Sequence, residues 1–194
     1  NLEVSTFRVI DVGAALASRM IVFTDGAAEQ QYYNWQRAGF GRYNNMRQAR
    51  KMMEEAERLG LGNYLPLADF FNSVHIIELT KVFGDVPYSD AILAGDGVYA
   101  PAYDRQDDIY LKVLNDLRQA STDLDVSKGE ITGDIIYGGD ITKWKKLINS
   151  YSLRLLISLS NKTNNANLDV VNRFKEIVDN PDQYPIFTSN DDNA

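Results

Sequence analysis

The sequence of 194 residues contains no cysteine and a single histidine, His75. Without cysteine it excludes disulfide scaffolds, thiolate metal sites and Cys nucleophiles. With one histidine it also excludes metal sites built from several histidines, and it weakens any Ser-His-Asp triad. We therefore expect no metal site and no cofactor. The sequence also offers no nucleophile–base arrangement, so we do not expect an enzyme.

The sequence also lacks long apolar runs and an excess of positive charge. Its longest apolar runs fall far short of the roughly 20 residues that cross a membrane. Lys and Arg number 20 against 27 Asp and Glu, which gives a formal net charge of −7. Because nonspecific binding to DNA or RNA needs clustered positive side chains, no nucleic-acid partner is expected. The chain starts without a signal peptide and ends in polar residues, so we expect a fragment of a longer protein.

What the sequence does contain is the composition of a folded helical domain. Hydrophobic residues make up 44% and charged residues 24%, as in ordinary globular proteins. Apolar residues recur at spacings of three and four, which is the period of one helix face. This periodicity predicts helices over residues 9–22, 43–59, 65–83, 106–124, 141–159 and 168–178. We expect one all-α domain over residues 1–194.

Local signals predict where these helices begin and end. Gly84 follows the third predicted helix and ends it, and Asp85 is expected to cap or turn the chain there. Asp104 and Asp140 each precede a predicted helix, where a carboxylate accepts N–H groups of the first turn, so both are predicted N-caps. Four glycines in residues 125–139 predict a loop or a short hairpin.

The second and third predicted helices would form one antiparallel pair, and the fourth and fifth another. Two stacked helix pairs suggest a tetratricopeptide-like arrangement. Trp144, Leu147 and Tyr151 match part of that repeat's pattern, although Ile148 stands where the repeat has glycine. The two pairs start about sixty residues apart instead of about 34, so we predict irregular repeats separated by long loops.

The segment KVFGDVPY at residues 81–88 is the most specific motif in the sequence. It ends a helix in a pattern that resembles the SusD/RagB family of outer-membrane nutrient-binding lipoproteins from Bacteroidetes. Three further segments resemble the same family and lie in its order: residues 42–49, 103–120 and 133–146. The last of them is similar to one SusD-like branch in particular.

This resemblance implies an all-α, SusD-like fold of irregular tetratricopeptide-like helix pairs with long loops. It implies a protein without catalytic activity that binds glycans or peptides at the cell surface and delivers them to a SusC-like TonB-dependent transporter. It also implies a surface-exposed lipoprotein of the outer membrane, held by an N-terminal lipid anchor that is absent from this chain. Family members are usually more than twice this length, so part of the ligand-contact surface is expected outside this sequence.

Tyr32, Tyr33 and Trp35 are the candidate ligand-binding aromatics, with Asn34 and Asp25 as polar partners. Sugar rings pack their C–H faces on aromatic rings, while their hydroxyls need amide or carboxylate partners. Binding sites provide this combination as apolar walls with a few placed polar groups. The resemblance implies the same place, because the family's binding surface uses residues just before the second helix. The alternative is that these aromatics fill the gap between the first two helices.

Other conspicuous residues favour structural interpretations. Trp144 and Tyr151 lie on an apolar helical stripe and are predicted core residues. His75 is predicted to be a structural residue, either hydrogen-bonded within the buried helix or placed at the edge of its apolar face. No pair of acids is marked by its setting as a glycosidase pair. Two other functions remain open on the sequence. One is an intracellular tetratricopeptide-like scaffold that binds a partner peptide, and the other is a fragment of an all-α glycan hydrolase.

Overall fold

A computed structural model of the protein describes residues 20–22, 24 and 38–192. These residues form the following helices: α3 (Arg42–Leu59), α4 (Tyr64–Phe83), α5 (Gln106–Asp123), α6 (Ile141–Ser158) and α7 (Val170–Asp179). Short 3-10 turns lie between and after them, and no strand occurs in this described part of the chain. The five helices predicted between residues 43 and 178 are confirmed, whereas the helix predicted over residues 9–22 lies almost entirely outside the described residues.

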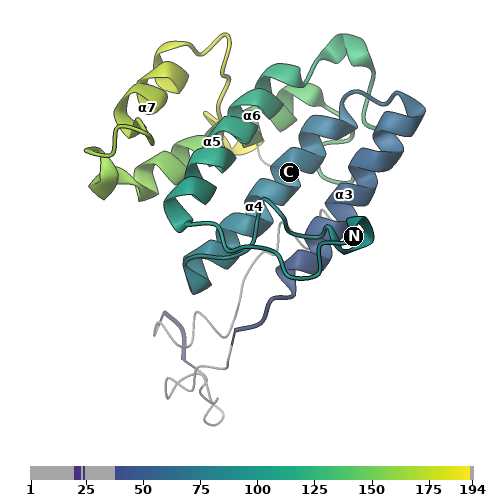
Figure 1. Cartoon of the computed structure of the whole chain (residues 1–194). Helices are drawn as coiled ribbons and strands as arrows, with labels where there is room; N and C mark the ends of the chain where they lie inside the picture. Colours follow the sequence, from purple (N-terminus) through teal and green to yellow (C-terminus); the bar gives the residue numbers. More distant parts are fainter. Residues whose placement is uncertain (1–19, 23, 25–37, 193–194) are drawn as a thin grey trace.

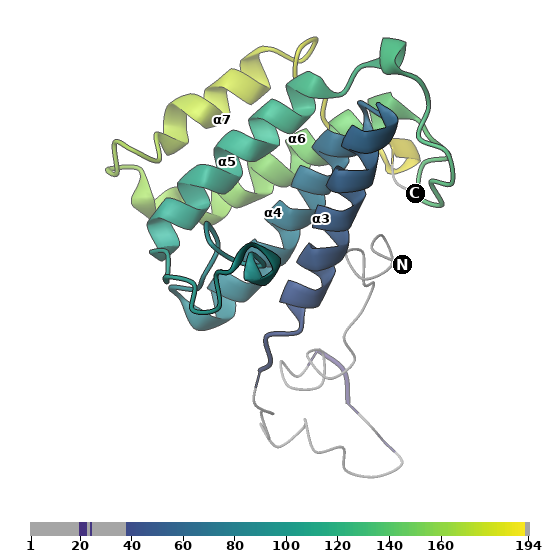
Figure 2. The same cartoon turned by 45° about the vertical axis from the view of Figure 1, so that its right-hand side comes forward.

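The helices pack side by side in chain order, each against the one before it (Figure 1). α4 lies between α3 and α5, while α7 packs on α6 and also lies beside α5, as the turned view shows (Figure 2). Helices that follow one another in the sequence are thus neighbours in space. The predicted all-α class and the pairs α3–α4 and α5–α6 are confirmed.

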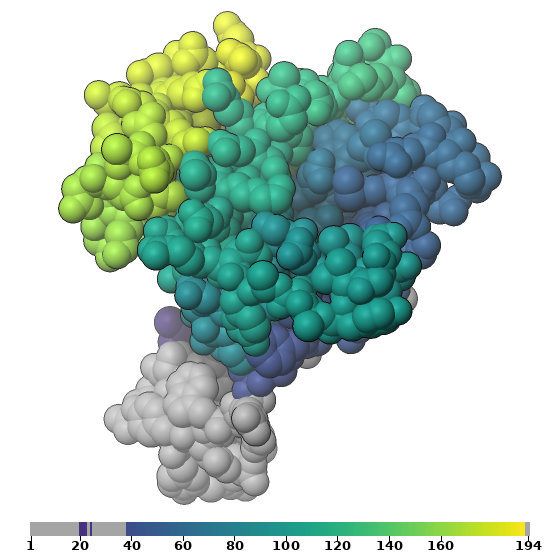
Figure 3. Space-filling model, in the orientation of Figure 1, coloured from purple at the N-terminus to yellow at the C-terminus, as the bar shows by residue number. Residues whose placement is uncertain are grey.

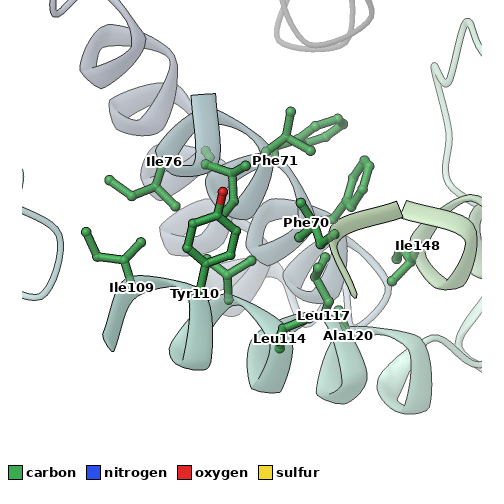
Figure 4. Close-up of a cluster of buried hydrophobic side chains, with 14 of the residues drawn as sticks. Phe70, Phe71, Ile76, Ile109, Tyr110, Leu114, Leu117, Ala120 and Ile148 are labelled. Atoms are coloured by element: carbon green, nitrogen blue, oxygen red, sulfur yellow. The ribbon is translucent and has the colours of Figure 1, made fainter. Parts of the chain in front are cut away.

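α4 contributes most to the core because apolar residues cover nearly its whole circumference. A helix of this kind is stable only when neighbours cover it on several sides. Figure 4 shows the resulting cluster at the contact between α4, α5 and α6, made of Phe70, Phe71, Ile76, Ile109, Tyr110, Leu114, Leu117, Ala120 and Ile148. Since α3 packs on α4 as well, the two helix pairs share one continuous core.

Trp144 of α6 closes this core. Its side chain is fully buried, and its ring meets those of Phe70 and Phe71 edge-on at centroid distances of 6.2 and 5.9 Å. Tyr151, two turns further along α6, packs edge-on against Phe70 at 5.8 Å. Such edge-to-face contacts add to the area that the rings bury. The core roles predicted for Trp144 and Tyr151 are confirmed.

The predicted N-caps have different outcomes. Asp140 caps α6, where its Oδ1 accepts the N–H groups of Thr142 and Lys143 at 2.8 and 3.1 Å. The prediction that Asp104 caps α5 is wrong. Asp85 accepts the first N–H of α5 instead, and Asp104 pairs through its backbone within the preceding loop, which directs its carboxylate to amides of that loop.

The segment between α5 and α6 is a loop and not a hairpin, and Asp134 organises it. Its carboxylate accepts the N–H groups of Ile136, Tyr137 and Gly139 at 2.8, 3.1 and 2.9 Å, and the indole N–H of Trp144 at 2.7 Å. Burial alone would raise the pKa of Asp134, but these hydrogen bonds outweigh it and hold the pKa below its ordinary value. Asp134 therefore joins the loop to the buried Trp144.

His75 has the structural role predicted for it. It is fully buried in α4, and its Nδ1 lies 3.5 Å from Nη1 of Arg42. Within the described residues, no group of His, Asp or Glu could hold a metal ion. No helix in that part of the chain is both long enough and apolar enough to cross a membrane.

Candidate functional site

The motif KVFGDVPY covers the last three residues of α4 and the first five residues of the loop between α4 and α5. Gly84 has φ 75° and ψ −123°, a conformation that L side chains rarely adopt. This turn brings Oδ1 of Asp85 to 2.9 Å from the backbone N of Gln106, at the start of α5. The side-chain amide Nε2 of Gln106 in turn donates to the backbone carbonyl of Thr80 at 2.7 Å. The motif therefore connects the end of α4 to the start of α5.

Gly84→Ala is expected to lower the free energy of unfolding by about 1–3 kcal/mol. No atom lies within 4 Å of the position of an added Cβ, so the loss would come from backbone strain and not from a clash. Gly95→Ala is the matched control, because it also has open space and lacks a positive φ. Chemical denaturation of both variants tests this expectation, and equal losses at the two positions would contradict it.

The base of the loop is closed by an antiparallel bridge between Val86 and Asp104. Their backbone N···O distances are 3.3 and 3.1 Å. The carboxylate of Asp104 also accepts the N–H groups of Tyr88 and Ser89 at 2.7 and 2.9 Å, and the hydroxyl of Ser89 at 2.8 Å. Burial alone would raise the pKa of Asp104, but these bonds hold the pKa below its ordinary value. The two ends of the loop thus hold each other in place.

Tyr88 and Tyr43 attach the loop to the helices on either side. The hydroxyl of Tyr88 donates to Asp116 of α5 at 3.1 Å, and Nζ of Lys112 lies 5.3 Å from the centroid of its ring. The hydroxyl of Tyr43 in α3 donates to the carbonyl of Pro87 at 2.6 Å. These contacts give the motif at residues 81–88 a positioning role. The bond from the backbone N–H of Gln106 to Asp85 confirms that Asp85 caps or turns the chain.

Four aromatic side chains gather where the chain enters α3 and leaves α4: Phe40, Tyr43, Phe83 and Tyr103. We call them the aromatic surface. Phe40 is 50% exposed, and its ring stacks on that of Phe83 at a centroid distance of 4.3 Å and an angle of 18°. The ring of Tyr43 lies 6.3 Å from that of Phe40. Burial, followed by the nearby Tyr103 and Asp104, raises the pKa of Tyr43 to about 12.

The aromatic surface has the chemistry of a carbohydrate platform. Tyr103 is 69% exposed, and its phenol lies near that of Tyr43, whose ring neighbours Phe40. A flat exposed ring accepts the apolar face of a sugar, and a phenol at its edge accepts or donates hydrogen bonds to hydroxyls. The loop that supplies Tyr103 runs across α4 in two views (Figure 1 and Figure 2).

The ligand residues predicted from the sequence cannot be placed beside this surface. Asp25, Tyr32, Tyr33, Asn34 and Trp35 all lie outside the described residues. Their role in binding stays a prediction. Phe40 follows Trp35 by five positions in the sequence.

Sequence reasoning missed Phe40 and Tyr103, and it took Phe83 for one of the apolar residues of a buried helix. A signal for Phe40 was present, because it stands alone between Gly39 and Gly41 and so belongs to no periodic helix face. Tyr103 offered no such signal, since its position is set by the backbone pairing of the next residue, Asp104, with Val86.

Comparison with known families decides which group of proteins has this combination of helices and loops. The model of the family SusD-like_2, described as "Starch-binding associating with outer membrane", matches residues 6–194. The chain belongs to this SusD-like family. Its relatives are binding proteins associated with the outer membrane, so nutrient binding in general is the role of the family.

Solved structures of SusD-like proteins agree with this assignment. A SusD homologue from Bacteroides fragilis NCTC 9343 matches with a TM-score of 0.86 and 39% identity, over 98% of this chain and 40% of its own. An outer membrane protein from Bacteroides vulgatus ATCC 8482, described as involved in nutrient binding, gives 0.85 and 39%, over 98% and 41%. A chitin-binding protein gives 0.65 and 28%, over 98% and 35%. The SusD-like chain thus spans about two fifths of the length of the first two relatives. A comparison with curated proteins found no match.

Proposed function

We propose that this SusD-like protein binds glycans, or peptides, at the cell surface and delivers them to a SusC-like TonB-dependent outer-membrane transporter. In this proposal it is a surface-exposed lipoprotein and catalyses no reaction. Membership of a family of outer-membrane nutrient-binding proteins is the observation that carries the proposal. The transporter, the lipid anchor and the ligand are the parts of the proposal that go beyond that membership.

The aromatic surface supports a glycan as the ligand. Binding sites combine apolar walls with a few oriented polar groups. The Phe40–Phe83 stack is an apolar wall whose Phe40 ring is half exposed, and the exposed Tyr103 supplies a phenol near Tyr43. The loop that carries Tyr103 is fixed at its base by Val86 and Asp104, so less conformational freedom is lost when a ligand binds.

The residues predicted from the sequence form the second part of the proposed site. Asp25, Tyr32, Tyr33, Asn34 and Trp35 precede Phe40 by 15 to 5 positions. They offer three aromatic rings, one amide and one carboxylate, which is the combination that sugars require. A solved relative described as a chitin-binding protein is 28% identical, which favours an oligosaccharide over a peptide.

Phe40→Ala is expected to weaken binding of a neutral oligosaccharide about tenfold, or about 1.4 kcal/mol. The reason is that alanine removes the exposed ring and leaves Phe83 without its stacking partner. Calorimetric titration of the full-length protein against a panel of neutral oligosaccharides and peptides measures this, with Trp35→Ala titrated in parallel.

Ile157→Ala is the matched control, because Ile157 is a 62% exposed apolar residue on α6, whereas the rings of the aromatic surface come from the start of α3, the end of α4 and the loop before α5. Binding that both aromatic variants weaken and the control leaves unchanged would support the class and the site. Equal affinity in all four proteins would place the site elsewhere. Release of shortened saccharides during the titration would contradict the absence of catalysis.

A further inference from the structure

A hollow lies apart from the aromatic surface, between the outer side of α3 and the 3-10 turn η2 (Ala94–Asp96). Its volume of about 560 Å³ falls within the range of small-molecule sites. Figure 3 shows the loop that contains η2, in teal, next to α3, in blue. We call this hollow the α3 groove. Its side chains come mainly from Arg47, Gln48, Arg50, Lys51, Ile92 and Asp96.

The α3 groove is cationic in a protein of net negative charge. Arg47, Arg50 and Lys51 stand against two acids in its walls, Glu54 and Asp96, which leaves the groove a net charge of +1. The whole chain, in contrast, has a formal net charge of −7. A concentration of positive charge in a concave site raises the local concentration of anions. Charge therefore indicates an anionic ligand at this place.

The acids of the groove are already engaged by Arg50 and Lys51. Arg50 donates to Asp96 at 2.8 Å and to Glu54 at 3.2 Å, and Lys51 pairs with the same Glu54. Arg47 forms no ion pair with any of the described residues, and its side chain is exposed. Its guanidinium is thus available for a planar anion such as a carboxylate, which it can bind through two parallel hydrogen bonds.

The opposite wall of the groove is held in a strained conformation. Ile92 has φ 66°, which a β-branched residue adopts only at a cost of about 1–3 kcal/mol. Nη1 of Arg50 donates to the carbonyl of Ile92 at 2.9 Å, while Nη2 of the same side chain binds Asp96. One arginine thus fixes both ends of the turn. Strain of this kind concentrates at ligand clamps, where it keeps a wall in its binding shape.

We propose that the α3 groove binds the acidic group of a saccharide, a uronate carboxylate or a sulfate ester. Arg47 takes the anion with Lys51 beside it, Gln48 binds neighbouring hydroxyls, and Arg50 holds the Ile92 wall. This inference rests on the proposed function, because it assumes a saccharide ligand. It adds a preference for acidic saccharides and a site that the aromatic surface does not include.

Calorimetric titration of the full-length protein with three trisaccharides of equal length tests the inference. The probes are trigalacturonate, a sulfated trisaccharide and neutral maltotriose. We expect at least one acidic probe to bind more tightly than the neutral one, with an affinity that falls as salt is raised. Arg47→Gln is expected to weaken that acidic probe about tenfold and to leave the neutral probe unchanged. The two acidic probes distinguish a carboxylate preference from a sulfate preference.

Arg58→Gln is the matched control, since Arg58 lies on the same helix, makes the same change of net charge and pairs with Glu55 outside the groove. A loss in Arg47→Gln that Arg58→Gln does not share supports the groove. Equal losses in both variants, or acidic probes that bind no better than the neutral one, would overturn it. Neutral saccharides that still bind through Phe40 in that case would leave the proposed function standing, whereas a failure of every saccharide and every peptide to bind would remove both.

Discussion

Asp134→Ala is expected to lower the free energy of unfolding by about 3–5 kcal/mol. The carboxylate accepts three backbone N–H groups and the indole N–H of the fully buried Trp144. Alanine leaves all four N–H donors without their acceptor. Each donor that stays buried and unpaired lowers the free energy of unfolding by about 1–3 kcal/mol, and water pairs with some of the four. Urea unfolding of the variant and the wild-type protein measures the difference.

Asp140→Ala controls for the loss of a carboxylate in the same loop. Asp140 caps α6 through two N–H groups, so its removal is expected to cost only about 1 kcal/mol. Trp144→Phe retains an aromatic ring and removes the indole N–H, so it should couple strongly to Asp134→Ala in a double-mutant cycle. A loss in Asp134→Ala no greater than that in Asp140→Ala would refute the organising role of Asp134.

Acidification from pH 7.5 to pH 4.5 is expected to cost about 2–3 kcal/mol through His75 alone. Burial, with a contribution from the nearby Arg42, lowers the pKa of His75 to about 4, against about 6.5 in an unfolded chain. The unfolded state therefore takes up the proton first as the pH falls, which favours unfolding. The stability that the neutral His75 contributes is present above about pH 6.5 and is lost as the pH falls toward 4. His75→Gln should remove this part of the pH dependence.

Asp69 acts in the opposite direction over the same range. Burial, with the charge of Asp116, raises its pKa to about 6, so the folded state binds the proton first as the pH falls. Acid thus stabilises the fold through Asp69 and offsets part of the loss through His75. In Asp69→Asn the free energy of unfolding should fall more steeply with acid than in the wild-type protein. In His75→Gln it should rise with acid instead. Urea midpoints at pH 7.5, 6, 5 and 4.5 measure both, and three proteins with parallel profiles would contradict the assignment.

The helices could be predicted from the sequence because their signals are local. Gly60 ends α3 with a φ of 68°, and Asp140 starts α6 as a capping carboxylate, and both are preferred residues at those positions. The prediction for α7 began at Leu168, two residues too early. Leu168 is buried like a helix residue, but Asp169 adopts a left-handed conformation with φ 46°, which delays the helix.

The candidate sites were harder to predict because they depend on contacts between distant residues. Asp104 looks like an N-cap in sequence, and only its pairing with Val86 shows that it serves the loop. Arg47 and Arg50 look like the solvent side of an amphipathic helix. Only the return of the chain at Ile92 and Asp96 converts that side into a wall of the α3 groove. Long-range pairings of this kind leave no trace in hydrophobic periodicity.

The closed base of the loop has a consequence for diversification. The bridge between Val86 and Asp104 already holds the two ends of this loop together. The number of residues between 89 and 103 therefore has little effect on the packing of the helices. Each doubling of such a segment adds only about 0.6 kcal/mol of closure entropy. The same helices α4 and α5 are thereby compatible with many different loops between residues 89 and 103. A designer who seeks a new saccharide preference in this protein can exchange these fifteen residues and leave α4 and α5 untouched.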